Sequence, residues 1–263
     1  MTRTVQQLFD LQGKTALVTG GSRGLGLQIA FALGEAGARI MLSSRKAGDL
    51  EEAAADLQAA GIDARWIAAD CAREDDIRKL AEQTMERMGD IDILVNNAGA
   101  AWGAPAEDHP VEAWDKVMNL NIRGYFLLSQ VVAKRSMIPR QRGRIVNIAS
   151  IAGLGGNPPE MNTIAYNTSK GAVITFTQAL AAEWGKYGIN VNAICPGFFP
   201  SRMTKGTLDR MGVDKLAANA PLRRLGDDED LKGTALLFAS DAGKHITGQW
   251  LAVDGGVSMV TGG

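Results

Sequence analysis

Three side chains suited to proton transfer at a carbonyl or alcohol oxygen lie close together in the sequence. Tyr166 and Lys170 are four residues apart at the start of a segment with helical periodicity, so they share one helix face. An ammonium beside a phenol favours the phenolate, and we expect Lys170 to lower the pKa of Tyr166 below its usual ~10. A tyrosine tuned in this way can donate or accept a proton at a substrate oxygen. Ser150 follows a predicted strand, and its hydroxyl can hold the same oxygen.

A glycine-rich turn follows the first predicted strand, in Thr19–Gly26 (TGGSRGLG). Its spacing differs from the common G-x-G-x-x-G pattern. Gly20 allows a tight exit from the strand, and Gly26 allows the next helix to pack closely on it. The free N–H groups at the start of that helix can bind a pyrophosphate, so the turn predicts a dinucleotide site.

The same turn also fits G-x-S-x-G, the nucleophile elbow of α/β-hydrolases, with Ser22 as nucleophile. This alternative needs an acid and then a histidine downstream, and His245 is the one late histidine. It leaves Ser150, Tyr166 and Lys170 without a purpose.

The end of the second predicted strand indicates which nicotinamide cofactor the site takes. An acid there accepts the ribose 2′-hydroxyl of NAD, whereas an arginine accommodates the 2′-phosphate of NADP. This chain has Ser44 and Arg45, with no acid before Asp49, and Arg23 adds a second cation. The pattern favours NADP(H). The alternative is that both arginines are ordinary solvated side chains.

Short apolar runs alternate with longer helical patterns along the chain. The runs predicted as strands are 15–19, 39–42, 65–68, 91–95, 144–148, 189–194 and 250–253. The segments predicted as helices are 25–35, 50–60, 77–87, 111–136, 165–187 and 231–240. The strand runs are continuously apolar, which is typical of strands buried on both faces. We therefore predict a single α/β domain over residues 1–263, with a doubly wound parallel sheet covered by helices on both faces.

Composition and charge exclude several function classes. The 263 residues carry 28 Lys and Arg against 29 Asp and Glu, a net charge of −1 that would not recruit nucleic acid or an anionic membrane. Cys71 and Cys195 form no disulfide or zinc motif, and with His109 and His245 as the two histidines we expect no metal site. No signal peptide or membrane-span pattern is present, so we expect a cytoplasmic protein.

The order of the motifs resembles the short-chain dehydrogenase/reductase family. The turn at 19–26, Asn96-Asn97-Ala98-Gly99, Ser150 and the Tyr166/Lys170 pair carry the resemblance, which extends over roughly 13–259. It implies a Rossmann-type sheet of seven parallel strands and hydride transfer to or from C4 of a nicotinamide.

The resemblance also implies catalytic roles. Tyr166 is the general acid in reduction and the base in oxidation, Lys170 lowers its pKa and binds the nicotinamide ribose, and Ser150 orients the carbonyl. Asn121 resembles the asparagine that holds a water in the proton relay, with Asn119 as the competing candidate.

Further residues resemble the family's cofactor contacts. Asp70 matches the aspartate that contacts adenine, Asn97 and Gly99 lie beside the adenine ribose, and Pro196-Gly197 with Ser201 match the segment that meets the carboxamide. The complete predicted cofactor site is Gly20, Ser22, Arg23, Gly24, Leu25, Gly26, Ser44, Arg45, Asp70, Cys71, Asn97, Ala98, Gly99, Tyr166, Lys170, Pro196, Gly197, Phe199 and Ser201.

One segment is longer than the family pattern, and another has an irregular composition. The interval from Ser150 to Tyr166 is longer than is common, and the extra residues fall in 153–163. They either reshape the substrate pocket or form a surface bulge. Residues 198–225, rich in Met, Gly, Pro and charge, are either a lid or an ordinary excursion with a short helix.

Substrate class and assembly follow only from likeness. LFDLQGK near the start and PGFFPSRMT at 196–204 resemble 3-oxoacyl-thioester reductases and gluconate 5-dehydrogenases about equally. Phe198 and Phe199 with nearby methionines suit an acyl chain, whereas Arg202, Thr204 and Lys205 suit a sugar acid; we favour the thioester.

A basic cluster at 134–144 is a candidate dock for an acidic acyl carrier protein. The last strand resembles a family interface, so we expect a homotetramer or homodimer. An NADP(H)-binding sensor or scaffold is the alternative from another class.

Overall fold

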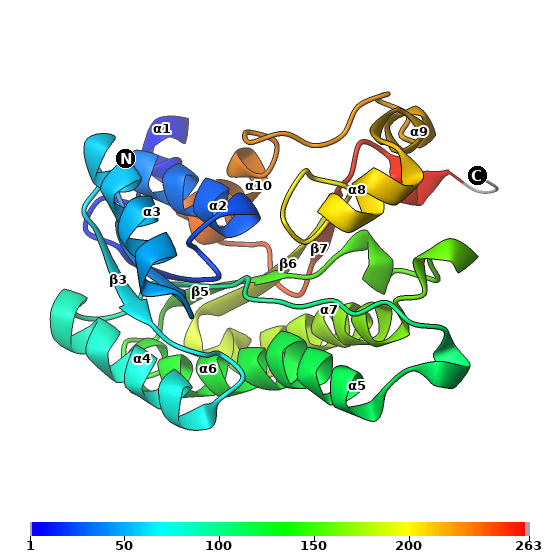
Figure 1. The fold of residues 1–263 in the computed structure, drawn as a ribbon. Helices are drawn as coiled ribbons and strands as arrows, with labels where there is room; N and C mark the ends of the chain where they lie inside the picture. The colour runs from blue at the N-terminus through cyan, green and yellow to red at the C-terminus, as the bar shows by residue number, and fades with distance from the viewer. Residues whose placement is uncertain (1, 261–263) are drawn as a thin grey trace.

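Seven parallel strands form one sheet in the order β3-β2-β1-β4-β5-β6-β7 in the computed structural model, which describes residues 2–260 (Figure 1). The strands are β1 (Thr15–Thr19), β2 (Arg39–Ser44), β3 (Ala64–Ala68), β4 (Ile93–Asn96), β5 (Gly143–Ile148), β6 (Ile189–Pro196) and β7 (Trp250–Val253). The chain winds outward from β1 in both directions, and the order reverses between β1 and β4. The predicted single α/β domain with a doubly wound, seven-stranded sheet is confirmed.

Helices cover both faces of this sheet (Figure 1). They are α1 (Val5–Phe9), α2 (Gly24–Glu35), α3 (Ala47–Ala59), α4 (Glu74–Met88), α5 (Val111–Met118), α6 (Gly124–Val132), α7 (Ile164–Trp184), α8 (Lys205–Met211), α9 (Val213–Asn219) and α10 (Lys232–Ala239). Helices α2, α3 and α10 share one apolar core with the sheet, through Ile29, Leu50 and Phe238. Helices α4, α6 and α7 share a second core on the other face, through Ile77, Leu128 and Leu180.

The central strands are buried along their whole length, as their apolar runs predict. Every residue of β1 and β4 is buried, and β6 is buried except at Asn190. A strand covered by helices on both faces has no side that can carry polar residues cheaply. The burial therefore explains why the strand runs do not alternate.

The predicted helix 111–136 is continuous but not uniform. Its backbone stays right-handed through two π-helical segments. Residues 119–123 separate α5 from α6, and residues 133–137 follow α6. A π-helical turn carries one extra residue and changes the direction in which its side chains point. The first of these turns contains Asn121.

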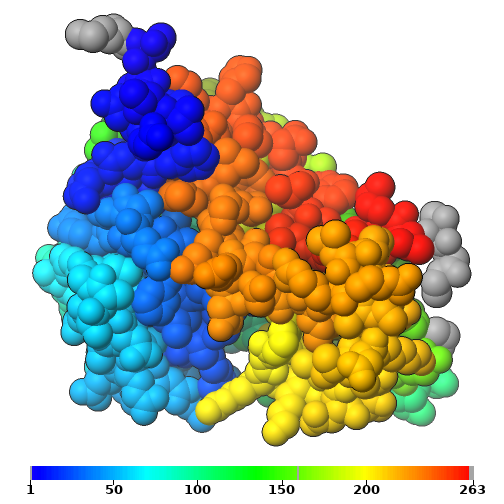
Figure 2. Space-filling view, turned by 90° about the horizontal axis from the view of Figure 1, so that it is seen from above, coloured from blue at the N-terminus to red at the C-terminus, as the bar shows by residue number. Residues whose placement is uncertain are grey.

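Segment 198–225 contains two short helices, α8 and α9, joined at Gly212, where φ is +84°. The sequence predicted either a lid or an ordinary excursion with a short helix, and the structure has two short helices here. The segment lies beyond the end of β6 and borders a hollow of the surface opposite the first βα unit (Figure 2).

Residues 2–260 contain neither a membrane-spanning helix nor a cluster of metal-binding side chains. No helix there is both long enough and apolar enough to cross a bilayer. The same residues contain no group of three His, Cys, Asp or Glu side chains arranged to hold a metal ion.

Candidate active site

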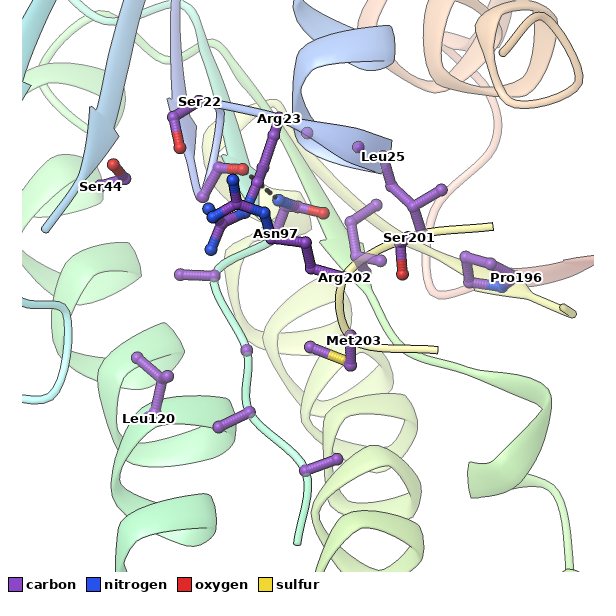
Figure 3. A pocket seen from close by; sticks show the side chains of 18 of the residues that line it. Ser22, Arg23, Leu25, Ser44, Asn97, Leu120, Pro196, Ser201, Arg202 and Met203 are labelled. Carbon is purple, nitrogen blue, oxygen red and sulfur yellow. Dashed lines mark hydrogen bonds between the residues drawn. The ribbon is translucent and has the colours of Figure 1, made fainter. Parts of the chain in front are cut away.

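A pocket of about 840 Å³ opens at the carboxyl edge of the sheet (Figure 3). Its walls come from the segments that follow β1 to β6, around the point where the strand order reverses. Open α/β sheets bind ligands at this place. Every residue of the predicted cofactor site lines the pocket, together with Ser150. Asn121, the remaining predicted catalytic residue, lies just outside it.

The glycine turn is held by backbone contacts that leave no room for side chains. A Cβ on Gly26 would lie 2.4 Å from the carbonyl oxygen of Gly20 and 2.4 Å from Nδ2 of Asn97. Gly20 itself has φ +63°, a conformation that L residues rarely adopt. The turn therefore brings the start of α2 directly against the end of β1.

Asn97 braces this turn. Its Nδ2 donates to the carbonyl oxygens of Thr19, at 2.9 Å, and Gly20, at 3.1 Å. The resemblance placed Asn97 beside the adenine ribose. In the structure both of its donor hydrogens are engaged by the turn, so its amide nitrogen positions the phosphate-binding backbone.

The end of β2 offers an unpartnered hydroxyl and a free cation to the pocket. Among the described residues, the buried Ser44 Oγ has no hydrogen-bond partner, and Arg45 is exposed and forms no ion pair. Lys46, which the sequence argument did not assign, lines the same corner. An orphaned hydroxyl beside two cations fits a phosphate ester.

Arg23, predicted to add a second positive charge beside the pocket, lines the pocket but is paired with a carboxylate. Its guanidinium donates to Asp49 Oδ2 at 2.8 Å, and Asp49 also lines the pocket. The charge of Arg23 is thus balanced within the protein. Arg45 and Lys46 carry the positive charge of this corner instead.

Asp70 and Cys71 follow β3 at the pocket wall. The Asp70 carboxylate accepts from the backbone N–H of Ala72 at 3.0 Å, which fixes the turn after the strand. Burial raises the pKa of the Cys71 thiol to about 12. Cys71 therefore acts as a small apolar side chain in the wall.

Lys170 points its ammonium group at the sheet. Its Nζ donates to the carbonyl oxygen of Ile148 at 2.6 Å and lies 5.7 Å from the centre of the Tyr166 ring. The Tyr125 hydroxyl donates to the same Ile148 oxygen at 3.3 Å. Burial lowers the pKa of Lys170 to about 8.

The expected lowering of the Tyr166 pKa by Lys170 is wrong. Burial raises the pKa of Tyr166, and the Ser150 hydroxyl opposes this shift only in part. Tyr166 therefore keeps its proton at neutral pH.

Ser150 is buried at the end of β5, where its Oγ accepts from the N–H of Ala152 at 3.1 Å. This bond fixes the hydroxyl oxygen and leaves the hydroxyl hydrogen free to donate. The arrangement lets Ser150 donate to a substrate oxygen.

Asn121 is fully buried, whereas its competitor Asn119 is exposed. Its Nδ2 donates to Ala100 O and to Ser169 Oγ, both at 2.9 Å, and its Oδ1 accepts from Ala100 N at 2.8 Å. The side chain ties the segment after β4 to α7. The water-holding role that the resemblance implies stays a prediction.

Residues 196–204 form the remaining wall. Thr204 Oγ1 donates to Phe199 O at 2.6 Å and bonds with Ser201 Oγ at 3.0 Å, so these hydroxyls stabilise their own turn. Arg202 and Met203 are exposed and extend into the pocket (Figure 3). From the sequence, Arg202 and Met203 were predicted as possible substrate contacts and not as part of the cofactor site.

Other lining residues were not assigned to the cofactor site from the sequence. They are Lys46, Asp49, Ala69, Ala100, Ala101, Leu120, Ile148, Ala149, Pro200, Arg202, Met203, Thr204 and Asp228. Most directly follow or flank the ends of predicted strands, a signal that could have found them. Asp228 has no such signal, because it reaches the pocket through a hydrogen bond of 2.7 Å from Gln28 on α2.

The hydrolase alternative is wrong. Ser22 lies at the carboxyl edge of the sheet, whereas His245 is exposed near the amino end of β6. Asn190, at the start of β6, donates to the carbonyls of Lys244 and Ile246 on either side of this histidine. The sheet therefore separates the two side chains.

The basic cluster is paired and lies at the amino end of β5. Its arginines contact carboxylates of Glu82, Asp90, Asp92 and Asp241. It does not present a row of free cations beside the pocket, so it does not support the predicted carrier-protein dock.

Comparison with known proteins agrees with this geometry. Residues 14–212 match the short chain dehydrogenase family. The chain is 38% identical over 253 residues to a gluconate 5-dehydrogenase of Gluconobacter oxydans, covering 96% of this chain and 97% of that one. It is 40% identical over 255 residues to the rhamnolipid-biosynthesis 3-oxoacyl-[acyl-carrier-protein] reductase of Pseudomonas aeruginosa, covering 95% and 98%.

A solved structure with the same fold is a gluconate 5-dehydrogenase from Burkholderia cenocepacia in complex with NADP and tartrate. It superposes with a TM-score of 0.92 at 34% identity, covering 98% of this chain and all of that one. Matches of this length and identity place the chain in the short-chain dehydrogenase family, among the oxidoreductases that interconvert CH–OH and C=O groups.

Proposed function

We propose that this chain is an NADPH-dependent reductase that converts a ketone to a secondary alcohol. One observation carries the proposal: Ser150, Tyr166 and Lys170 lie on the wall of the pocket that contains the glycine turn. Proton-transfer groups and a dinucleotide-binding turn that share one pocket suit hydride transfer coupled to proton transfer.

The residues of the pocket fit NADP(H). The N–H groups at the start of α2, beside Gly20 and Gly26, would hold the pyrophosphate, and Ser44 with Arg45 would hold the 2′-phosphate. NADPH, when bound, supplies the hydride. The chain's residues supply orientation and the proton.

Tyr166 is the general acid of this reaction. Its raised pKa keeps the phenol protonated at neutral pH, ready to protonate the carbonyl oxygen. Ser150 donates a hydrogen bond to the same oxygen, with its own oxygen fixed by Ala152. Lys170, held by Ile148, places a positive charge where the phenolate develops. Asn121 holds the segment after β4 in place beside them.

We favour a 3-oxoacyl thioester as substrate. Met203, half exposed, offers an apolar surface at the pocket, while the hydroxyl of Thr204 is engaged by Phe199 and Ser201. An acyl chain needs the former and has no use for polar donors. The 40% identity to a 3-oxoacyl-[acyl-carrier-protein] reductase supports this substrate class.

A sugar acid is the second candidate. Arg202 lines the pocket and forms no ion pair among residues 2–260, so it is available to a substrate carboxylate. The 38% identity to a gluconate 5-dehydrogenase favours the same substrate class.

The test follows NADPH oxidation with a 3-oxoacyl thioester and with 5-ketogluconate in parallel. Turnover of the thioester alone supports the favoured substrate, and turnover of 5-ketogluconate alone supports the second. Turnover of neither, followed by failure of a broad ketone panel, contradicts the proposed activity.

Tyr166→Phe separates an enzyme from an NADP(H)-binding sensor. Loss of the phenolic proton should lower kcat about 10²- to 10⁴-fold, the usual contribution of a general acid. The Kd for NADPH, measured by fluorescence titration, should stay within about twofold. Unchanged turnover would contradict the assigned role of Tyr166.

A further inference from the structure

The long interval between Ser150 and Tyr166 contains a loop that is tied to the catalytic helix. Residues 153–163 begin at the end of a 3₁₀ turn that follows Ser150, contain a second 3₁₀ turn at Pro159–Met161, and end just before α7. We propose that Asn167 is a positioning residue that holds this loop as a preformed wall of the substrate entrance. The inference deepens, and rests on, the proposed ketone reductase function.

Asn167 uses its complete hydrogen-bonding capacity on this loop. Its Nδ2 donates to the carbonyls of Ala152, at 2.8 Å, and Gly155, at 3.0 Å. Its Oδ1 accepts from Thr163 Oγ1, at 2.9 Å, and from Asn157 Nδ2, at 3.1 Å. A side-chain amide has two donor hydrogens and two lone pairs, and all four have partners here.

Asn157 closes the network. Its Nδ2 also donates to Thr163 Oγ1, at 2.9 Å. The start, middle and end of the loop thus meet at one side chain, that of Asn167. A surface bulge without function has no need of such a saturated polar cluster.

The far end of the loop is tied to a second wall of the pocket. The carbonyl of Asn162 accepts from Ala104 N at 2.9 Å, and Met161 is buried. Ala104 belongs to the segment after β4, whose Ala100 is held by Asn121. The loop therefore bridges the catalytic helix and the segment that lines the pocket at Ala100 and Ala101.

The hydrogen-bond network around Asn167 lies next to both side chains that act on the substrate oxygen. Asn167 is the next residue after Tyr166, and Ala152 follows Ser150 by two positions. The network thus joins the immediate neighbours of both groups that meet the substrate oxygen. Between its anchors the loop exposes Leu154, Gly155 and Gly156, and a Cβ on either glycine would meet open space. The loop does not line the pocket itself but flanks Ser150 and Tyr166, so we infer that a substrate too large for the pocket meets this fixed rim and that the rim discriminates by substrate size.

The test compares Asn167→Ala, Asn157→Ala and the control Thr168→Ala. Thr168 is exposed on the same helix and takes no part in the network. We measure kcat and KM for the accepted ketone and for a bulkier homologue, the Kd for NADPH, and hydrogen exchange of the 153–158 amides.

For Asn167→Ala we expect KM for the accepted ketone to rise about tenfold and preference over the bulkier ketone to fall, with kcat and NADPH affinity within about twofold. The loop amides should exchange at least about tenfold faster. Asn157→Ala, which leaves both Asn167 donor bonds in place, should give smaller changes in the same direction. Thr168→Ala should match the wild type.

Equal loss of kcat for both ketones at unchanged KM would overturn the proposal, because Asn167 would then only align Tyr166. Unchanged exchange in the loop would overturn it as well. If Asn167→Ala does not fold, Asn157→Ala decides between the same outcomes. If the wild type reduces no ketone, the proposed function fails, and the exchange measurement still tests whether Asn167 holds the loop.

Discussion

At the residue scale, two ionisable groups, the partly buried Tyr166 and the buried Lys170, set the pH behaviour of the site. Burial raises the pKa of Tyr166 and lowers that of Lys170 to about 8. Both shifts favour the neutral form of each group, as desolvation requires. Between the two, Lys170 is the group that changes charge nearest to neutral pH.

We expect ketone reduction to be fastest below pH 8 and to decline above it. Reduction needs the proton on Tyr166, which its raised pKa retains throughout this range. As the pH rises through about 8, Lys170 loses the charge that stabilises the developing phenolate. A profile of kcat against pH in the reductive direction checks this. A flat profile from pH 7 to pH 10 would contradict it.

Arg45 is the residue on which we expect cofactor preference to depend. It is an exposed cation beside the unpartnered Ser44 hydroxyl. Arg45→Ala should weaken NADPH binding about tenfold or more and leave NADH binding nearly unchanged, because only the former carries a 2′-phosphate.

Titration of both cofactors measures this effect, with Arg210→Ala as the control because Arg210 is basic but does not line the pocket. Equal weakening of NADPH and NADH would show that Arg45 does not read the 2′-phosphate.

At the element scale, the close approach of β1 and α2 depends on Gly26. A Cβ on Gly26 would lie only 2.4 Å from the Gly20 carbonyl oxygen and 2.4 Å from Nδ2 of Asn97. One backbone segment and a bracing side chain thus occupy the space of one methyl group. This contact positions the N–H groups at the start of α2, which we propose bind the pyrophosphate.

Gly26→Ala should weaken NADPH binding at least about tenfold, since the methyl group must push the turn apart. Gly48→Ala is the matched control, because Gly48 also lies near the start of a helix but has open space around its Cα. It should be neutral or slightly stabilising. Calorimetric titration with NADPH and thermal melts of both variants check the pair. Normal binding by Gly26→Ala would show that the turn is plastic.

Much of this element arrangement could be predicted from the sequence, and what could not has identifiable causes. Apolar runs located all the strands, and the glycine turn, Ser150 and Tyr166, which were singled out from the sequence, line one pocket. Helical periodicity over 111–136 cannot reveal π-helical turns, because one extra residue hardly disturbs the pattern. The contacts of Arg23, Asn97 and Asn167 depend on partners that only the tertiary structure brings together.

At the scale of the whole molecule, the β7 edge of the sheet exposes an apolar surface. Trp250 and Leu251 are each more than 40% exposed, and Met259 and Val260, which follow β7 in the chain, are also exposed. An uncovered apolar strand at a sheet edge invites pairing with another chain. We therefore keep the prediction of a homodimer or homotetramer with β7 in an interface.

Leu251→Glu should lower the mass in solution by at least half, because a charge would be buried in that interface. Sedimentation velocity of this variant and of the control Val5→Glu checks this. Val5 is also exposed but belongs to α1, near the start of the chain, and not to the β7 edge. A wild type that sediments as a monomer would contradict the prediction.

The partner of Lys170 is a main-chain atom, the carbonyl oxygen of Ile148 at the end of β5. Every amino acid carries that oxygen, so no point mutation at position 148 can delete it. The position of the Lys170 ammonium group is therefore as resistant to point mutations as the pairing of the sheet. Sequences can drift at this position without losing the anchor for as long as β5 stays paired between β4 and β6.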